Sequence, residues 1–306
     1  MERLYLESDT FKSAHIPLIS RRIGVEGKVR FREVPDVVDA EGRKKQEALY
    51  PEKLKRSQGK EIGKSLQYGL SAKDAETIVP IESYNSEFGY RLTVPVSVIN
   101  YSRIEYAISE NSRDLPNVLG ISEIFRGRNS YLFVKRGEKV AYYDSPEQLH
   151  ALVAGGFPRN ITPIMPDNMT VKKWLDEQQM TEHAIKPSEV AGRVILGVVL
   201  DKLVPGYKPE ILLTGFARYK TMSKKALDQR KPLDSFERDR IVEAPATEEG
   251  LAKLILENSW PGKNVPVGLA GAILELGRIG GFRALDNLIS EAKQHGAPTF
   301  KYAIRA

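Results

Sequence analysis

The sequence predicts a mixed α/β (α+β) fold, with a mixed sheet lying between helices. Three observations between residues 117 and 217 predict it. Two apolar runs are joined by a short polar turn, a third run ends at a pair of glycines, and a helical pattern is followed by two more apolar runs. Because strands and helices do not alternate regularly in this order, it favours a mixed sheet over a purely parallel one.

The first two apolar runs, residues 118–125 and 131–134, predict a β-hairpin. The four residues between them, Arg126-Gly127-Arg128-Asn129, have the composition of a turn. Lys135 and Arg136 follow the second strand directly, and a cation in this place can face a phosphate group. Arg136 is therefore a candidate ligand-binding residue, with a solvated strand end as the alternative.

The third apolar run, residues 149–154, stops at Gly155 and Gly156. Glycine tolerates backbone conformations closed to other residues, so the pair predicts a sharp exit from a strand. Upstream of this strand, Tyr142 is a candidate for stacking on a base or sugar. Packing against the protein is the alternative for that ring.

A helix is predicted after Thr170. Val171, Trp174, Leu175 and Gln178 recur at the spacing of one helix face, so this face should lie against the sheet with Trp174 buried. Two further apolar runs, residues 194–200 and 211–216, complete the predicted sheet. Toward the C-terminus we expect a helix capped by Thr247, a helix rich in small residues that ends near Gly280 and Gly281, and a last amphipathic helix.

The domain division suggested by these patterns places the main domain at residues 84–306. Residues 1–83 form an N-terminal extension or small domain of uncertain fold. The extension contains short apolar runs that predict strands. Whether it folds separately or adds strands to the main sheet is left open by the sequence.

Composition excludes several classes of protein. The 306 residues contain no cysteine, which rules out disulfides, thiolate zinc sites, iron–sulfur clusters and cysteine nucleophiles. No apolar run approaches the ~18 residues of a membrane-spanning helix, and the sequence starts without a secretory signal pattern. We therefore expect a cytoplasmic protein without membrane contact.

The net charge is +6, which makes a phosphorylated ligand or nucleic acid a candidate partner. Residues 43–64 form a basic segment: eight lysines and arginines accompany four glutamates between residues 41 and 64. Such a segment can contact the phosphates of a nucleic acid or a ribonucleoprotein assembly. A solvated surface rich in lysine is the alternative interpretation.

Residues 85–275 resemble the Nudix hydrolase superfamily. The letters VAYYDSPEQLHALVAGG resemble the usual approach to the Nudix box, and IKPSEVAGRVILGVVLD followed by PEILLTGFA resembles what comes after it. The part before the hairpin is loosely similar to the UDP-glucose-pyrophosphatase-like group. The resemblance implies a mixed sheet between helices and Mg²⁺-dependent hydrolysis of a nucleoside diphosphate derivative.

The family holds Mg²⁺ with glutamates in the motif Gly-x5-Glu-x7-Arg-Glu-U-x-Glu-Glu-x-Gly-U, where U is aliphatic. Mg²⁺ prefers several convergent oxygen ligands, and this chain matches the motif poorly in both available registers. Placing Leu175 at the central U leaves Glu177 at a glutamate position and puts Trp174 at another. Placing Ala184-Ile185 at the closing Gly-U leaves Glu182 instead. One of the three helix glutamates survives either way.

The resemblance therefore implies a degenerate Nudix box. The candidate catalytic and metal-binding residues are Glu177 and Glu182, and the candidate ligand-binding residues are Arg136, Tyr142, Gly155, Gly156 and Trp174. The favoured interpretation is a non-catalytic factor that binds a nucleotide, a nucleic acid or a protein. The alternatives are a divergent Mg²⁺-dependent hydrolase and a structural subunit of a larger assembly.

Overall fold

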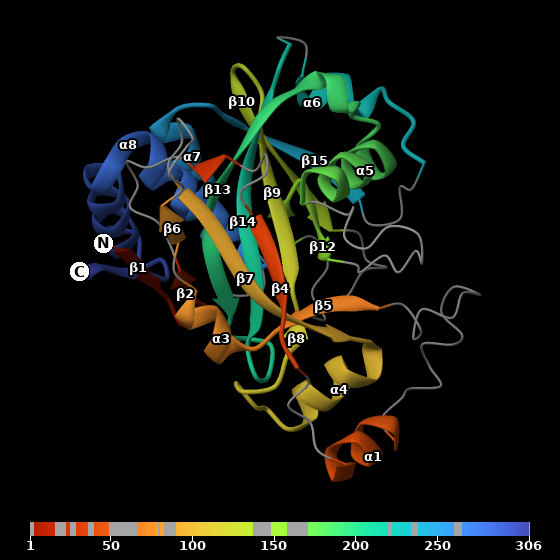
Figure 1. Cartoon of the computed structure of the whole chain (residues 1–306). Coiled ribbons are helices and arrows are strands. Elements are labelled where there is room, and N and C mark those ends of the chain that lie inside the picture. Colours follow the sequence, from red (N-terminus) through yellow and green to blue (C-terminus); the bar gives the residue numbers. More distant parts are fainter. Residues whose placement is uncertain are drawn as a thin grey trace.

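A computed structural model describes residues 3–15, 23–24, 29–35, 40–48, 66–78, 80–82, 90–136, 148–157, 171–219, 222–233, 238–259 and 265–305. Within these residues the fold is α+β, as the sequence predicts. It contains an eleven-stranded mixed sheet, a five-stranded sheet and helices (Figure 1). None of the described helices is long and apolar enough to cross a membrane.

The centre of the large sheet is formed by the strands that the sequence predicts. Strand β9 (Gly120–Arg126) lies parallel to β14 (Lys208–Ala217), which pairs antiparallel with β13 (Val190–Asp201). Strand β10 (Ser130–Arg136) turns back on β9, so the predicted hairpin is confirmed. Parallel and antiparallel pairing in one sheet confirms the expected mixed layer.

The third apolar run differs from the prediction, because it forms two short strands. Strand β11 (Leu149–Ala151) pairs with β10, whereas β12 (Val153–Gly156) pairs with β9. The chain changes partner at Leu152, which separates the two strands. The strand ends at Gly156, as predicted, although both glycines belong to β12 and neither has a positive φ.

Residues of the N-terminal extension add strands to the large sheet. Strand β2 (Phe11–His15) and strand β3 (Ile23–Gly24) pair with β13, and β1 (Arg3–Glu7) pairs with β2. The sheet is extended beyond β1 by β16 (Lys301–Arg305), and at its other side β15 (Arg238–Pro245) pairs with β10.

The five-stranded sheet also combines both parts of the chain. Its longest strand, β7, pairs with three strands of the extension, β4, β5 and β6, and β5 in turn pairs with β8. The strands are β4 (Val29–Glu33), β5 (Gln67–Leu70), β6 (Pro80–Glu82), β7 (Tyr90–Ile99) and β8 (Asn117–Val118).

Seven α-helices connect or cover these strands in the described part of the chain. They are α1 (Ala40–Ala48), α3 (Ala72–Thr77), α4 (Tyr101–Ser109), α5 (Val171–His183), α6 (Lys224–Asp228), α7 (Glu248–Asn258) and α8 (Pro266–Gln294). Helix α8 is interrupted at Gly281, whose φ of 67° is left-handed. The two helices expected on either side of this glycine are thereby confirmed.

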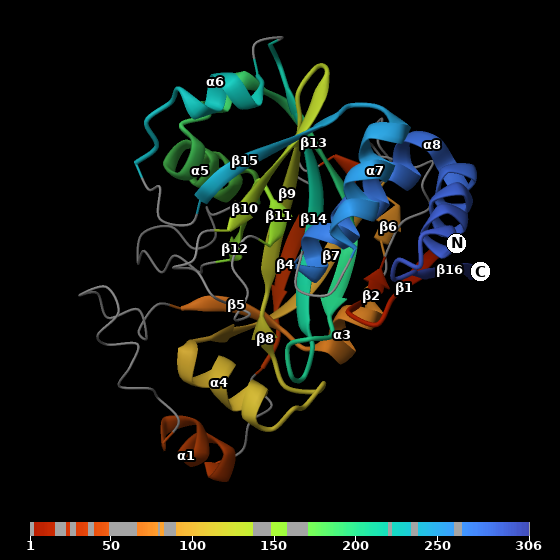
Figure 2. The same cartoon turned by 180° about the vertical axis from the view of Figure 1, so that it is seen from behind.

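The two faces of the large sheet are covered differently. Helices α7 and α8 cover one face, where their apolar residues form a core with Ile124 and Leu212 (Figure 2). The other face packs against the five-stranded sheet and against helix α5, around Ile121, Leu213 and Trp174 (Figure 1). A second sheet therefore covers much of this face of the large sheet, which was expected to be covered by helices.

Candidate functional site

The candidate site lies where helix α5 packs on strands β9, β12 and β13. Trp174 is 3% exposed, which confirms its predicted burial, and its ring meets Phe157 edge to face with centroids 6.0 Å apart. A Cβ atom on Gly155 would lie 3.3 Å from the indole. The absence of a side chain at Gly155 therefore lets the helix approach the sheet.

Gly156 has a similar role on the side of the five-stranded sheet. A Cβ atom there would lie 2.7 Å from Oε1 of Gln67 and 2.9 Å from Cγ2 of Val118. Because both distances are shorter than normal van der Waals contact, only glycine allows β5 and β8 to come this close. The described structure explains both glycines by packing, and their ligand-binding roles stay predictions.

Three buried polar side chains connect helix α5 to the sheet. Arg193 on β13 donates through Nε to Oε1 of Glu123 on β9 at 2.8 Å, and Gln179 on α5 donates to Oε2 of Glu123 at 2.6 Å. Arg193 also donates through Nη2 to Oε1 of Gln179 at 3.0 Å. The three groups form a closed ring of hydrogen bonds, called here the Glu123 network.

Gln179 corrects one detail of the predicted helix face. The sequence analysis placed Gln178 toward the sheet, whereas Gln179 is fully buried and Gln178 is half-buried. Positions seven and eight residues along from Val171 both lie near the inward face of a helix. Gln179 is the one that faces inward because Glu123 and Arg193 satisfy its amide.

A second carboxylate approaches the same guanidinium. Nη1 of Arg193 lies 2.8 Å from Oδ1 of Asp176, and Lys172 binds the other oxygen of Asp176 at 3.1 Å. Burial disfavours the charge on Arg193, but the carboxylates of Glu123 and Asp176 outweigh burial and raise the pKa of Arg193. Burial raises the pKa of Glu123, and Arg193 offsets part of that rise.

This arrangement limits what the site can do chemically. The guanidinium lies between two carboxylates from different elements, so it already supplies the positive charge that a metal would otherwise provide there. Among the described residues, no group of three or more His, Asp or Glu side chains is arranged to hold a metal ion.

The predicted metal-binding residues lie on different sides of α5. Glu177 is exposed, whereas Glu182 is half-buried, with Oε2 3.7 Å from Nε2 of His183. That nitrogen lies 2.6 Å from the carbonyl oxygen of Leu152. Five residues along a helix correspond to a rotation of about 140° from the starting direction. The described helix therefore does not bring the two glutamates together.

Helix α5 ends in a turn whose left-handed position is usually glycine, and here Ala184 occupies that position. Ala184 has a φ of 53°, and the amide of Ile185 donates to the carbonyl of Gln179 at 3.1 Å. Ala184 itself donates to the carbonyl of Met180 at 3.1 Å, and this bond from a left-handed residue to the carbonyl four positions earlier is the αL motif, which favours glycine at the left-handed position. Ile185 is fully buried after the turn.

Replacing Ala184 with glycine should stabilise the protein by about 0.5–1 kcal/mol, because it relieves the left-handed strain at a position that already has this conformation. Urea unfolding measures the effect. Ala303→Gly, at an exposed position of β16 that pairs in regular register with Tyr5, is the control and should lower stability. A loss of stability in Ala184→Gly would contradict the assignment of the turn.

The other predicted site residues receive less structural information. Arg136, the last residue of β10, lies opposite Arg238 of β15 in the backbone register of the two antiparallel strands. Tyr142 lies outside the described residues, and of the basic segment 43–64 only residues 43–48 are described, within helix α1. Their roles remain predictions.

The sequence analysis missed Glu123 and Arg193. Part of the signal was present, because Glu123 lies inside the apolar run 118–125 and Arg193 directly precedes the run 194–200. A charge in such a place requires a partner of opposite sign. That rule would have selected the two residues, although it would not have identified Gln179 or Asp176 as further partners.

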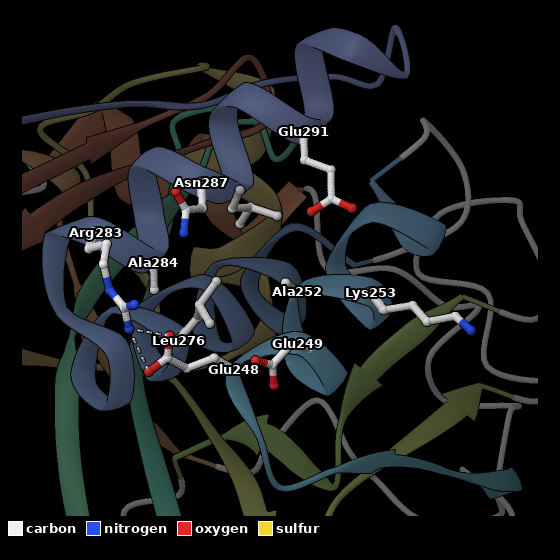
Figure 3. Close-up of a pocket in the computed structure, with 10 residues that line it drawn as sticks. Glu248, Glu249, Ala252, Lys253, Leu276, Arg283, Ala284, Asn287 and Glu291 are labelled. Carbon is white, nitrogen blue, oxygen red and sulfur yellow. Dashed lines mark hydrogen bonds and ion pairs between the residues drawn. The ribbon is translucent and has the colours of Figure 1, made fainter.

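A groove of about 470 Å³ lies apart from this site, between α7 and the second half of α8. Its floor includes Leu276, Ala284 and Leu288, and Glu249 and Glu291 line its edge (Figure 3). At one end Arg283 donates to Glu248 at 3.1 Å. The groove thus combines an apolar floor with acidic side chains.

Comparison of the sequence with models of known protein families gives no match, and comparison with curated proteins gives no relative. The functional argument therefore rests on the residues themselves.

Proposed function

We propose that this chain is a Nudix-like binding protein in which a buried arginine has replaced the catalytic metal as the counter-ion beside the box helix. The observation that carries the proposal is the position of Arg193 between Glu123 and Asp176. A Mg²⁺ ion would need oxygen ligands in an octahedral arrangement. In this chain the inward side of α5 instead presents Trp174 and Gln179.

The end of α5 supports the second of the two registers. In that register Ala184 and Ile185 occupy the closing Gly-U of the motif, and they have the left-handed φ and the burial that a glycine and an aliphatic residue would have. The three helix glutamates then correspond to Gln178, Thr181 and Glu182. A single carboxylate among them makes a weak Mg²⁺ site.

The ligand class that suits this proposal is a nucleotide or another phosphorylated compound, bound without turnover. Divergent hydrolysis, with Glu182 and carboxylates from outside α5, is the alternative. A structural role in a larger assembly is the second alternative, and the groove between α7 and α8 is the surface it would use, because an apolar floor with acidic edges complements a basic amphipathic segment.

The proposal is tested by combining turnover with binding. A panel of nucleotide sugars, dinucleotides and nucleoside triphosphates is incubated with the protein, with and without Mg²⁺ or Mn²⁺, and released phosphate or nucleoside monophosphate is measured. We expect no metal-dependent turnover. Calorimetric titration of the same compounds should give metal-independent binding for at least one of them.

Metal-dependent turnover that is lost in Glu182→Gln and kept in Glu257→Gln would overturn the proposal in favour of the hydrolase. Glu257 is an exposed glutamate of α7 and therefore a matched control. Absence of both turnover and binding, in a folded preparation, would favour the structural alternative instead.

A further inference from the structure

A short stretch late in the chain is strongly basic. Residues 217–231 contain six basic residues and one acidic residue, a net charge of +5, whereas the whole chain has +6. The sequence analysis left this stretch unassigned. The acidic residue of this stretch is Asp228, and the next acidic residues of the chain follow residue 233.

Helix α6 and its neighbours bring this stretch together with the end of helix α5. Nη1 of Arg230 donates to the carbonyl oxygen of Ala184 at 2.8 Å, and the amide of Arg218 donates to the carbonyl of Glu189 at 2.7 Å. Figure 1 shows α6 beside α5 at one end of the large sheet. Lys186 therefore lies on the same side of the sheet end as the basic residues of 218–219 and 222–231, and this region is called here the α6 surface.

Two carboxylates of the α6 surface are already paired. Glu189 accepts two hydrogen bonds from Arg230, at 2.7 and 2.9 Å, and these bonds lower the pKa of Glu189. Asp228 forms an ion pair with Lys224 at 2.9 Å. Glu189 also interacts electrostatically with Lys186, whereas the ion pair of Asp228 is to Lys224.

Three exposed lysines remain on the α6 surface. No carboxylate of the described residues lies within ion-pair distance of Lys186, Lys225 or Lys231. Arg218 is exposed as well, and its guanidinium donates a 3.5 Å hydrogen bond to the backbone carbonyl of Val190. Four cations grouped in this way attract a partner that carries several negative charges.

An exposed aromatic ring lies next to one of these cations in the chain. Tyr219 directly follows Arg218 and is 53% exposed, and Leu233, which follows Lys231 by two residues, is 85% exposed. Large apolar side chains are unusual in a highly charged surface stretch. A ring beside several phosphate-binding cations is the combination that holds single-stranded nucleic acid, whose bases stack while its phosphates pair with cations.

We propose that the α6 surface binds single-stranded nucleic acid through Lys186, Arg218, Lys225 and Lys231, with Tyr219 stacking on a base. An anionic membrane would also attract the lysines, and a tyrosine ring can lie at a membrane surface, so vesicles of anionic lipid are measured beside the oligonucleotide. The inference does not depend on the Nudix-like assignment, because none of these residues belongs to the box helix.

The test measures binding of a fluorescently labelled single-stranded oligonucleotide of mixed sequence by anisotropy, over a series of salt concentrations. The test variant combines R218E, K225E and K231E. The control variant combines K253E, K293E and K301E, which are exposed on other elements and change the net charge equally. Circular dichroism and thermal melting establish that both variants are folded.

We expect the test variant to lose at least about tenfold in affinity and about 2 units of the slope of log K against log salt, because each phosphate contact to a single strand contributes about 0.7. The control variant should lose much less. Y219A should weaken binding severalfold with an unchanged slope, because stacking carries no charge.

The proposal is overturned if the wild-type protein does not bind the oligonucleotide, or if both triple variants lose affinity equally. It is also overturned if two results coincide. Y219A would bind the oligonucleotide as tightly as the wild type does, and the wild type would bind vesicles containing anionic lipid as tightly as it binds the oligonucleotide. Should the triple variant unfold, the corresponding glutamine substitutions provide the same comparison. Nucleotide turnover and binding at the box helix are measured separately, so either proposal can fail without the other.

Discussion

Replacing Arg193 with methionine should destabilise the protein by about 3–5 kcal/mol. Methionine fills much of the same volume, but it leaves Glu123 fully buried without its cation, and an unpaired buried charge is among the most costly defects in a protein interior. Urea unfolding at pH 7 measures the loss. The matched control is Arg128→Met in the exposed β9–β10 turn, which should change stability by less than about 0.5 kcal/mol.

A second substitution should recover much of this loss. In the double variant Arg193→Met with Glu123→Gln, the buried charge is gone and Gln179 can still hydrogen-bond to the new amide. An equal loss in the single and double variants would show that the defect comes from packing, and it would contradict an ionic role for the Glu123 network.

The deficit of Arg193→Met should also depend on pH. Burial raises the pKa of Glu123 in the folded protein, and removing Arg193 removes the main influence that lowers it. A carboxyl group whose folded pKa is raised stabilises the protein below its unfolded pKa and loses that contribution as pH rises. The difference from the wild type should therefore be smaller near pH 4 than at pH 8.

Replacing Trp174 with alanine should lower the free energy of unfolding by about 3–5 kcal/mol. The indole is buried between Gly155 and Phe157, and alanine would leave a cavity that the strands cannot close. Urea unfolding followed by circular dichroism measures the loss, since a fluorescence signal would change with the tryptophan itself. Trp174→Phe should recover part of the stability.

The exposed Tyr219 provides the control for Trp174, because Tyr219→Ala removes an aromatic ring from the surface and should change stability by less than about 0.5 kcal/mol. Similar losses in Trp174→Ala and Tyr219→Ala would refute the packing account. A marginal loss in Trp174→Ala alone would indicate that the helix does not rest on the sheet through this ring.

The strands of the central sheet could be predicted because their apolar runs are local signals. The runs 118–125 and 194–200 are recognisable without knowledge of their partners. Pairing is a different kind of information. The division of residues 149–156 between β10 and β9 depends on two partners that lie elsewhere in the chain, and no local pattern specifies it.

The candidate site was predictable only in part for the same reason. Trp174 follows from helical spacing, whereas the hydrogen bond from Arg193 to Glu123 joins residues 70 positions apart. The α6 surface was overlooked for a similar reason. Lys186 is separated in sequence from Arg218 and Lys231, and only the contact between Arg230 and the end of α5 shows that these parts of the chain lie together.

The pairing of β1 with β16 has a consequence for synthesis on the ribosome. Leu4 lies opposite Ile304, and Tyr5 lies opposite Ala303. After β1, nearly three hundred further residues must therefore be translated before β16 can cover the outer hydrogen-bonding edge of β1. Until then the nascent chain exposes a sheet edge, the type of surface that recruits other unpaired strands or a chaperone.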